Sequence, residues 1–428
     1  MKTLVLITSQ FPFGSGESFI DSEYPVIARS FEQIIVISQN VSSEKTRKVV
    51  TSASVYRYNT TTSLSGFLRL PIQVLANFST IQMLTNEEIS FRRKTENHLS
   101  VKNLYILLKK IIKAVQLKDF IKKVLAKEGI NESIVFYSYW LKTGAHAISL
   151  LDYKNSIKIA RAHGSDIYEE KTEAGYLPLL RYSALQMNAV FFASRDGKDY
   201  IERKIKVRSP AFLVSYLGVT KPDFGETKRS ETDKFVIVSC SNLIPLKRID
   251  LLIKALETVK TDKPVEWLHF GDGILRKELE EEASLRLTSK SGMSFRFMGH
   301  YPNNELMEFY NRNKVDLFIN TSSTEGLPVS IMEAQSYGIP VIATDTGGVR
   351  EIVVEGTGSL LPVNFLPADL AILIEYYAGL NEENYEAIKG NAIRNWESNF
   401  NAASNYRDFL IKLNSIFTAG STDSSSLI

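Results

Sequence analysis

The segment VDLFINTSSTEGLPVSIMEAQSYGIPVIATD, residues 315–345, has the order strand, loop, helix and strand. Its two apolar runs, VDLFINT and IPVIATD, have the length and composition of buried parallel strands. Between them lie a Gly-Leu-Pro turn and an apolar stretch that begins near Pro328, and proline is favoured in the first helical turn. A strand–helix–strand unit predicts a parallel sheet, and therefore an α/β fold.

Similar apolar runs recur along the whole chain and alternate with helical patterns. The first half contains TLVLIT (3–8), QIIVIS (33–38), SIVFYS (133–138), SIKIARA (156–162) and AVFFAS (189–194). The second half adds KFVIVSC (234–240), VEWLHFG (265–271) and SFRFMGH (294–300) to the two runs above. We therefore expect an α/β protein of two Rossmann-like, doubly wound domains that face a cleft, with ligands at the carboxyl ends of the strands.

The polar, turn-rich stretch GVTKPDFGETKRSETDK, residues 218–234, predicts a linker between the two domains. It separates an N-terminal domain, residues 1–217, from a C-terminal domain, residues 235–395. A final helix at about 396–417 is expected to pack back onto the first domain. The polar residues 418–428 are expected to form a disordered tail.

The composition is that of a soluble globular protein, with 44% hydrophobic and 23% charged residues among 428. The single cysteine, Cys240, excludes an intramolecular disulfide and fits a reducing cytoplasm. The apolar run at the N-terminus is too short for a secretory signal, and no uninterrupted apolar stretch approaches about 20 residues. The expected location is the cytoplasm.

The net charge of +3 conceals a difference between the halves. Residues 1–220 hold 30 Lys and Arg against 19 Asp and Glu, which gives +11; the remainder holds 21 against 29, which gives −8. Much of the excess lies in the amphipathic stretch 102–127. Two interpretations of it stay open: a solvated helix face, or a surface that contacts an anionic membrane. Nucleic acid is disfavoured because no aromatic-basic binding module is evident.

Two acids bracket the turn of the opening segment. Glu325 lies on the expected loop, and Glu333 lies on the helix that follows. The backbone N–H groups at the start of that helix, with the positive end of its dipole, predict a phosphate site. Carboxylates beside such a site suit hydroxyl groups, as the acid of a dinucleotide fold binds a ribose. The segment therefore predicts a site for a nucleotide sugar.

These residues resemble a known family. EGLPVSIME, residues 325–333, resembles the E-x₇-E motif of the retaining glycosyltransferases of family 4, which have the two-domain GT-B fold. The resemblance extends to SCSNLIPLKRIDLLIKAL (239–256), HFGDGILRKELE (269–280) and FMGHYPNNELMEFY (297–310). In the first half it includes ARAHGSDIYEE (160–170) and FPFGSGESFIDSEYPVIARSF (11–31). Many members act in bacterial polysaccharide assembly.

The resemblance implies roles for residues of the second half. Glu325 would hold hydroxyls of the donor sugar, Glu333 would hold the ribose, and Lys247 would neutralise the departing diphosphate. The family's usual arginine is replaced by Ser241-Asn242, and Arg248 is the candidate to compensate. The remaining donor-binding candidates are Gly326, Leu327, Pro328, Asn242, Gly271 and Gly299, although Pro328 itself has no N–H to offer.

In the first half, the resemblance implies that His163 approaches the donor sugar. Gly16 is a further donor-binding candidate, and Gly14, Ser15 and Glu17 would form an acceptor-side or phosphate loop. The catalytic candidates are thus Glu325, His163 and Lys247. The sequence contains no Asp-x-Asp, so neither a metal nor another cofactor is expected, and no base–nucleophile pair is evident.

Structural alternatives remain open for each candidate. Glu325 and Glu333 are solvated acids in the simplest alternative, Lys247 a surface lysine, and His163 a satisfied buried histidine. The glycines of the first loop fit a plain turn, and Asp166 fits a helix cap. The expected partners are a nucleotide sugar and a glycan or lipid-linked acceptor. Alternative functions are a GT-B epimerase or phosphorylase, or an inactive nucleotide-sugar-binding subunit.

Overall fold

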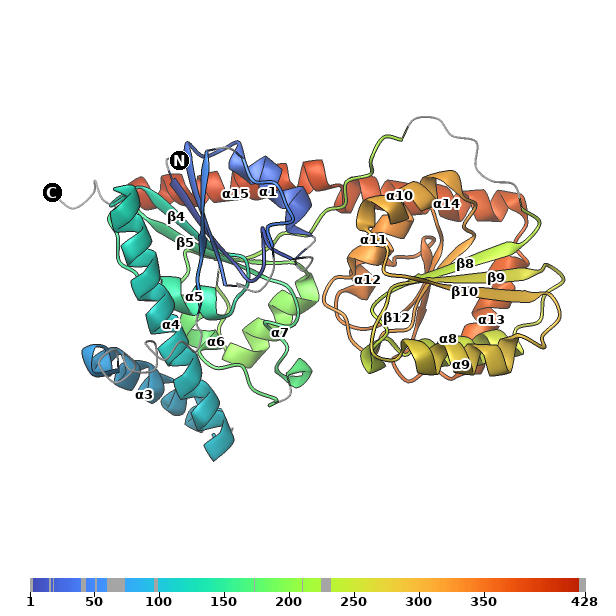
Figure 1. The fold of residues 1–428 in the computed structure, drawn as a ribbon, viewed down its shortest axis with the longest axis horizontal. Helices are drawn as coiled ribbons and strands as arrows, with labels where there is room; N and C mark the ends of the chain where they lie inside the picture. The colour runs from blue at the N-terminus through green and yellow to red at the C-terminus, as the bar shows by residue number, and fades with distance from the viewer. Residues whose placement is uncertain are drawn as a thin grey trace. The chain divides into compact units, whose positions relative to one another are not determined.

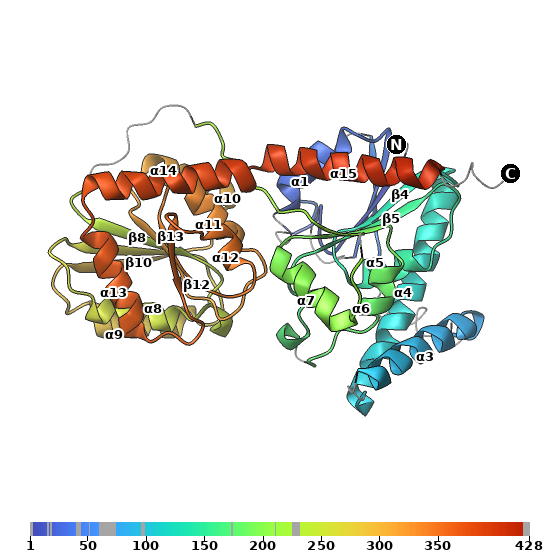
Figure 2. The same ribbon diagram turned by 180° about the vertical axis from the view of Figure 1, so that it is seen from behind.

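A computed structural model describes residues 3–14, 17, 19–39, 44–50, 52–59, 74–95, 99–172, 174–209, 211–224 and 232–422, with side chains as far as 417. The chain divides into two compact units, Met1–Ser215 with Tyr406–Ile428, and Tyr216–Asn405. Each unit is an α/β layer structure around one parallel sheet, and Figures 1 and 2 show helices on both faces of each sheet. Two Rossmann-like domains are therefore confirmed.

The sheet of the first unit has seven parallel strands in the order β3-β2-β1-β4-β5-β6-β7. Strand β1 is the switch point of the sheet: β2 and β3 follow on one side of it, and β4 to β7 follow on the other, as in doubly wound sheets. The strands are β1 Thr3–Thr8, β2 Gln33–Ser38, β3 Ala53–Arg57, β4 Ile134–Ser138, β5 Ile157–Ala162, β6 Ala189–Phe192 and β7 Phe212–Val214.

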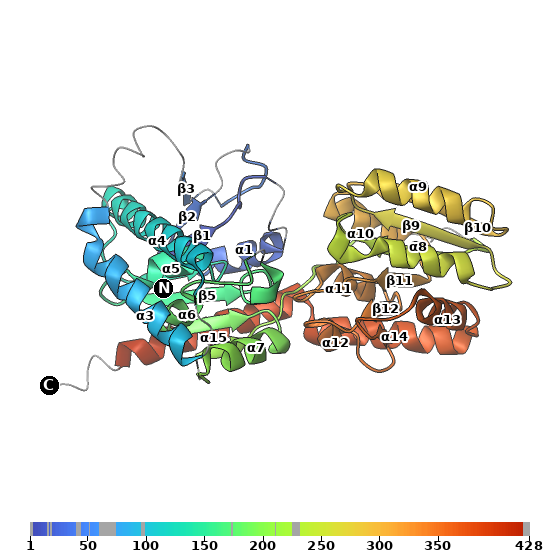
Figure 3. The ribbon, with the colours of Figure 1, turned by 90° about the horizontal axis from the view of Figure 1, so that it is seen from below.

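Two apolar layers cover the two faces of this sheet. Helices α4 and α5 and the helices near β6 pack on one face, while α1 and the residues Phe409 and Leu413 of α15 pack on the other. The helices of this unit are α1 Ile20–Ala28, α3 Phe78–Lys94, α4 Val101–Glu128, α5 Thr143–Ser149, α6 Leu180–Leu185, α7 Arg195–Ile205 and α15 Ala402–Thr422. Figure 3 shows α3 and the first turns of α4 on the outside of the unit.

The second unit has six parallel strands in the order β10-β9-β8-β11-β12-β13. They are β8 Phe235–Cys240, β9 Val265–Phe270, β10 Met293–Gly299, β11 Leu317–Asn320, β12 Val341–Thr344 and β13 Gly358–Leu361. The helices are α8 Ile249–Thr258, α9 Arg276–Leu287, α10 Asn303–Arg312, α11 Val329–Ser336, α12 Val349–Ile352, α13 Pro367–Ala378 and α14 Glu382–Asn399. Helices α8, α9 and α13 cover one face, and α10, α11 and α14 cover the other (Figure 1).

The structure differs from the sequence prediction in three places. Strands β3, β7 and β13 were not predicted, and each lies at the edge of its sheet, where partial exposure removes the continuous apolar run. Pro328 is the extended residue before α11 instead of its first turn. Helix α15 continues to Thr422, into the segment expected to be a disordered tail, whereas residues 423–428 lie outside the described part of the chain.

Candidate active site

The second unit gathers its predicted site residues at the carboxyl edge of its sheet. The loops after β8, β11 and β12 hold one another through backbone groups there. Ser323 N donates to Leu246 O at 2.8 Å, and Gly348 N donates to Gly326 O at 2.7 Å. Because these bonds join three separate loops, the edge is a preformed surface and not a set of independent turns.

Lys247 and Glu325 meet at this edge. Lys247 Nζ lies 2.6 Å from Glu325 Oε1, and the two side chains keep 21% and 12% of their surface exposed. Asn320 Nδ2 donates to the same oxygen at 3.3 Å. The pair joins the loop after β8 to the loop after β11, so the two predicted catalytic groups are in contact, and each remains within reach of solvent.

Glu333 lies on α11, eight residues after Glu325. It is 8% exposed, and Asn303 Nδ2 at the start of α10 donates to Glu333 Oε1 at 2.6 Å. Burial raises the pKa of Glu333 to about 7, and the hydrogen bond from Asn303 opposes that rise. The carboxyl group of Glu333 therefore gains or loses its charge close to neutral pH.

Cys240, at the end of β8, is close enough to Glu333 and Lys247 for their charges to act on its thiol. Burial raises the pKa of its thiol to about 12; the charge of Glu333 adds to the rise, and the charge of Lys247 opposes it. Lys247, which contacts Glu325, and Glu333 thus both act electrostatically on the end of β8.

The loop that carries Glu325 depends on a glycine that the sequence prediction did not single out. Gly347 has φ +56°, and a β-carbon there would lie 2.2 Å from the backbone oxygen of Glu325. Only glycine fits this position. The sequence feature that could have revealed this position is the adjacent glycine pair Gly347-Gly348. Gly326, Leu327 and Pro328 follow Glu325 directly and lead into α11, and Leu327 is buried.

Arg248 lies away from Lys247, although the two are adjacent in sequence. Its backbone is left-handed, with φ +49°, and this turns the side chain toward neighbouring loops. Nε donates to Thr321 O at 2.7 Å, and Nη1 donates to Val363 O at 2.6 Å. The guanidinium also lies 5.1 Å from the centre of the Phe365 ring. In this arrangement Arg248 stabilises the loops and does not complete a cation pair with Lys247.

The other donor-binding candidates, Gly271, Gly299 and Asn242, make backbone contacts within the second unit. Gly271 has φ +140°, and a β-carbon there would lie 1.9 Å from Ser241 O. Gly271 N donates to Gly299 O at 2.8 Å, so these two glycines let the ends of β9 and β10 approach closely. Asn242 is exposed, and its backbone oxygen accepts a hydrogen bond from Ile244 N at 3.0 Å.

His163 of the first unit lies among aromatic rings at the end of β5. Its ring centre is 4.6 Å from that of Trp140 and 4.8 Å from that of Phe19. Nε2 lies 3.1 Å from the Tyr139 carbonyl oxygen, which can only accept, so the proton is on Nε2. Burial is the main cause that lowers the His163 pKa to about 4, so the ring is neutral at pH 7. Nδ1 is then a buried acceptor, and no described residue donates to it.

Glu17 has a structural role at the end of β1. Its carboxylate accepts hydrogen bonds from Ser9 N at 2.9 Å, Gln10 N at 2.5 Å and Phe11 N at 2.7 Å, and also from the indole of Trp140. The side chain is buried and φ is +61°. These contacts occupy the carboxylate with the protein's own backbone, in place of the ligand contact expected for this acid.

Two further expectations concern neighbouring positions of the first unit. Asp166 accepts hydrogen bonds from His163 N at 2.9 Å and Gly164 N at 2.8 Å, which precede it in the chain, so it stabilises its own loop. The capping alternative is wrong, because the short helix Glu169–Lys171 has Tyr168 as its N-cap and no side-chain cap. Gly14 is left-handed, with φ +66°, and its N–H donates to Glu44 O at 3.2 Å. Ser15 and Gly16 lie outside the described residues.

Neither a metal centre nor a membrane-spanning helix is present among the described residues. No group of three or more His, Cys, Asp and Glu side chains among them is placed to hold a metal ion. Among the helices in the described ranges, none is both long and apolar enough to cross a membrane.

The chain was also compared with known proteins. Residues 221–395, which include Lys247, Glu325 and Glu333, match the family model "Glycosyl transferases group 1". The chain is 27% identical over 251 residues to an uncharacterized glycosyltransferase of Methanocaldococcus jannaschii, covering 58% of this chain and 66% of that protein. It is 26% identical over 181 residues to the O-antigen biosynthesis glycosyltransferase WbnH of Escherichia coli, covering 42% and 48%.

A third relative is the GDP-mannose-dependent monoacylated alpha-(1-6)-phosphatidylinositol monomannoside mannosyltransferase of Corynebacterium glutamicum. Here the identity is 29% over 215 residues, covering 48% of this chain and 53% of that protein. The matched region thus spans about half to two thirds of the length of these relatives.

Solved structures share the fold over almost the whole chain. HepE of Anabaena, in complex with UDP and glucose, has a TM-score of 0.65 at 18% identity, covering 96% of this chain and 99% of that one. Sucrose-phosphate synthase of Thermosynechococcus elongatus has a TM-score of 0.70 at 13% identity, covering 98% and 100%. Residues 221–395 thus resemble glycosyl transferases of group 1 over the part of the chain that carries Lys247, Glu325 and Glu333, and the solved structures show that the two-domain fold is shared.

Proposed function

We propose that this protein is a retaining glycosyltransferase of the E-x₇-E type. It moves a sugar from a UDP- or GDP-linked donor to a glycan or lipid-linked acceptor in cell-surface polysaccharide biosynthesis. The observation that carries the proposal is the convergence of Lys247, Glu325 and Glu333 at one sheet edge, inside the matched region. Relatives named for O-antigen biosynthesis and for GDP-mannose-dependent transfer support the classes of acceptor and donor.

Each of the three residues has a task in the proposed donor site. The charged carboxylate of Glu333 accepts hydrogen bonds from the ribose hydroxyls, and Asn303 holds it in place. Lys247 Nζ binds the diphosphate. Glu325 binds hydroxyls of the donor sugar and, through its contact with Lys247, keeps the ammonium group at the diphosphate before the donor arrives.

The chemical step breaks the bond between the anomeric carbon and the diphosphate oxygen. Negative charge then grows on the leaving group, and Lys247 and the amides at the start of α11 stabilise it. The acceptor hydroxyl oxygen bonds to the anomeric carbon on the face that the leaving group vacates, and its proton passes to the departing diphosphate oxygen, so the configuration is retained. No residue is assigned as a nucleophile. The resemblance assigns His163 to the donor sugar, and because the ring is neutral at pH 7 it would not act there as a cation.

The proposed reaction uses no metal and no other cofactor, since Lys247 and the helix amides supply the positive charge at the diphosphate. Activity is therefore expected to survive EDTA. Loss of activity on chelation that manganese or magnesium restores would contradict this part of the proposal.

The proposed setting is the cytoplasmic face of a membrane that carries the acceptor. The excess of positive charge in residues 1–220 supports peripheral contact with anionic lipid. The contact is expected to be reversible and to weaken as salt screens the charges.

Thermal stabilisation by a panel of UDP- and GDP-sugars tests the proposal. A donor at 100 times its Kd adds about 2.7 kcal/mol to the unfolding free energy. The stabilising donor is then incubated with candidate acceptors, and NMR establishes whether the product keeps the anomeric configuration of the donor. If no nucleotide sugar stabilises the protein, the proposed donor site is wrong. An inverted product would contradict the retaining mechanism alone.

A further inference from the structure

Helices α3 and α4 form a pair on the outside of the first unit. Leu84 of α3 packs with Leu107, Ile111 and Val115 of α4, and all four side chains are buried. Figures 1 and 3 show this pair beside the main body of the unit, with α3 and the first turns of α4 on its outer side. The apolar residues between the helices therefore already have partners, and the outward faces can be considered separately.

The outward faces of this pair are unusually apolar. The docking face, as we define it, consists of Leu75, Phe78, Met83, Val101, Leu104, Tyr105 and Leu108. Val101 is 88% exposed, Leu75 is 75%, Tyr105 is 65% and Phe78 is 59%. Among the described residues of the first unit, the other exposed large apolar side chains are Leu185 and Ile411, one each on α6 and α15. The exposed large apolar side chains of this unit are thus concentrated on two helices that contact each other, and such a concentration marks an interaction site.

The docking face has positive charges around it. Arg93 and Lys94 are exposed in the last turn of α3, and Lys102 and Lys109 are exposed on α4. From Val101 to Lys118 the sequence contains no Asp or Glu. Exposed apolar side chains surrounded by cations are complementary to an anionic membrane surface, where both kinds of group find partners.

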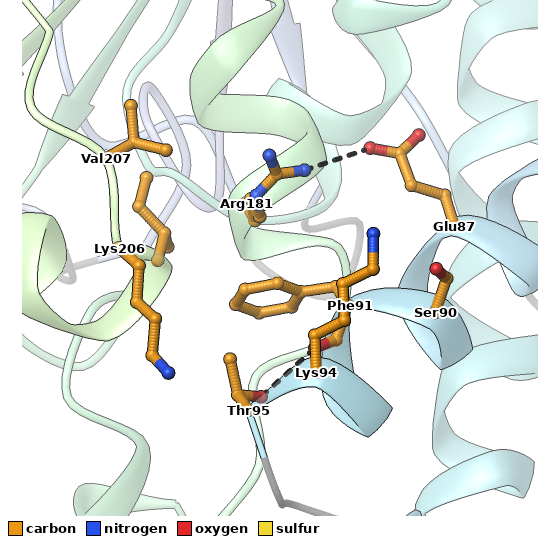
Figure 4. Close-up of a pocket in the computed structure, with 9 residues that line it drawn as sticks. Glu87, Ser90, Phe91, Lys94, Thr95, Arg181, Lys206 and Val207 are labelled. Atoms are coloured by element: carbon orange, nitrogen blue, oxygen red, sulfur yellow. Dashed lines mark hydrogen bonds and ion pairs between the residues drawn. The ribbon is translucent and has the colours of Figure 1, made fainter.

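A cavity of about 360 Å³ lies on the same helix α3 (Figure 4). Lys94 and Phe91 of α3 line it, together with Arg181 of α6 and Lys206 at the end of α7. Arg181 lies 5.4 Å from the centre of the Phe91 ring and 3.6 Å from the carboxylate of Glu87. Three cations face one acid in this cavity, so its charge suits a phosphate-bearing headgroup.

The second half of α4 differs from the first. Lys122 and Lys123 are exposed there, but no large apolar side chain between Leu117 and Glu128 is exposed. Lys118 donates to Asn77 Oδ1 at 2.9 Å and lies 3.3 Å from Asp119. These lysines therefore have the features of a solvated helix face, although the sequence alone groups them with Lys102 and Lys109.

We propose that the docking face binds the surface of an anionic phospholipid membrane. Its apolar side chains enter the interface, while Arg93, Lys94, Lys102 and Lys109 contact headgroup phosphates. The cavity beside Arg181 accepts one such headgroup. The inference rests on the proposed lipid-linked acceptor for its biological reason, but vesicle binding needs neither donor nor acceptor, so the two proposals can fail separately.

Co-sedimentation with vesicles of phosphatidylglycerol and phosphatidylcholine tests the proposal, with pure phosphatidylcholine as the neutral comparison. The first variant is Phe78→Ser with Tyr105→Ser. The second is Lys102→Gln with Lys109→Gln, and its matched control is Lys122→Gln with Lys123→Gln, which removes the same charge from the same helix. Thermal melting confirms that each variant is folded.

We expect wild type to bind the anionic vesicles at low salt and to ignore the neutral ones. The Phe78/Tyr105 variant should bind at least about tenfold more weakly, and the Lys102/Lys109 variant roughly fivefold more weakly for each lysine removed. The Lys122/Lys123 control should bind as wild type does. Absence of wild-type binding, or equal loss in both lysine variants, would overturn the proposal. Unchanged binding of the folded Phe78/Tyr105 variant would point to a protein partner for this face.

Discussion

The two sheets of this protein place charged residues at equivalent carboxyl edges, but the residues are used differently. In the second unit, Lys247 and Glu325 contact each other and remain partly exposed, and burial raises the pKa of Glu333 on α11 to about 7. In the first unit, Glu17 and Asp166 accept hydrogen bonds from backbone N–H groups and are buried. The acids of the first unit are thus held by backbone N–H groups of their own loops, whereas Glu325 and Glu333 are contacted by the side chains of Lys247, Asn320 and Asn303.

The comparison predicts its largest effect at Lys247. Lys247→Ala should lower turnover on the order of 10²–10³-fold, because the variant loses a fixed charge at the leaving diphosphate. Lys254→Ala is the matched control, since Lys254 is also a lysine of this unit in an ion pair, with Asp250 at 2.9 Å. Steady-state kinetics with the stabilising donor measures both variants. Similar turnover in the two variants would contradict the proposal that Lys247 stabilises the leaving diphosphate.

At Glu17 we expect a substitution to lower stability and to leave nucleotide affinity unchanged. Glu17→Ala leaves three backbone N–H groups and the Trp140 indole without their carboxylate, so the unfolding free energy should fall by about 3 kcal/mol or more. Affinity for free nucleotide should not change. Chemical denaturation and calorimetry provide the two measurements, and the exposed Glu44 of the same region provides the control substitution. If the variant kept wild-type stability but used the acceptor poorly, Glu17 would instead have the acceptor-side role that the resemblance implies.

Glu333 should make nucleotide affinity depend on pH. With a folded-state pKa of about 7, the carboxyl group is mostly charged at pH 8 and mostly protonated at pH 6. Since the charged form accepts the ribose hydroxyls, affinity should fall about tenfold from pH 8 to pH 6. Glu333→Gln should bind weakly with a flat profile. A wild-type profile as flat as that of Glu333→Gln would contradict the ribose contact.

The same shift has a consequence for stability, with the opposite direction in pH. Burial raises the Glu333 pKa from 4.5 to about 7, so between these values the folded state binds more protons than the unfolded state does. Its contribution to stability is therefore fully present below about pH 4.5 and is lost as the pH rises toward 7. Glu333→Gln should remove this part of the pH dependence.

The smallest predicted effect concerns Asn303, which holds Glu333 from α10. Asn303→Ala removes a donor to the carboxylate, and this should raise the Glu333 pKa further and move the midpoint of the affinity profile to higher pH. At neutral pH the loss of affinity should be a few-fold. Titration calorimetry across the pH range distinguishes this shift from a uniform loss at every pH, which would show that Asn303 contacts the nucleotide directly.

Most of the fold was predictable because buried parallel strands are continuous apolar runs. Strands β1 and β2 have the predicted bounds, and the edge strands β3, β7 and β13 escaped because their exposed residues interrupt the pattern. The contact between Lys247 and Glu325 was not predicted, because the resemblance assigned one residue to the diphosphate and the other to the donor sugar. The position of Arg248 was not predictable, since it follows from a left-handed backbone at a residue other than glycine. The contact of Glu17 with Trp140 joins residues 123 positions apart, which no local pattern reveals.

Hydrogen exchange with and without the most stabilising nucleoside diphosphate tests the central claim most directly. The claim is that the carboxyl edge of the second unit binds the donor nucleotide, whereas the charged residues at the corresponding edge of the first unit serve its own backbone. The account predicts slower exchange in residues 241–248 and 321–333, and no change in residues 3–14 and 139–166. Protection of the first unit's edge, with unchanged exchange around Lys247 and Glu325, would contradict it.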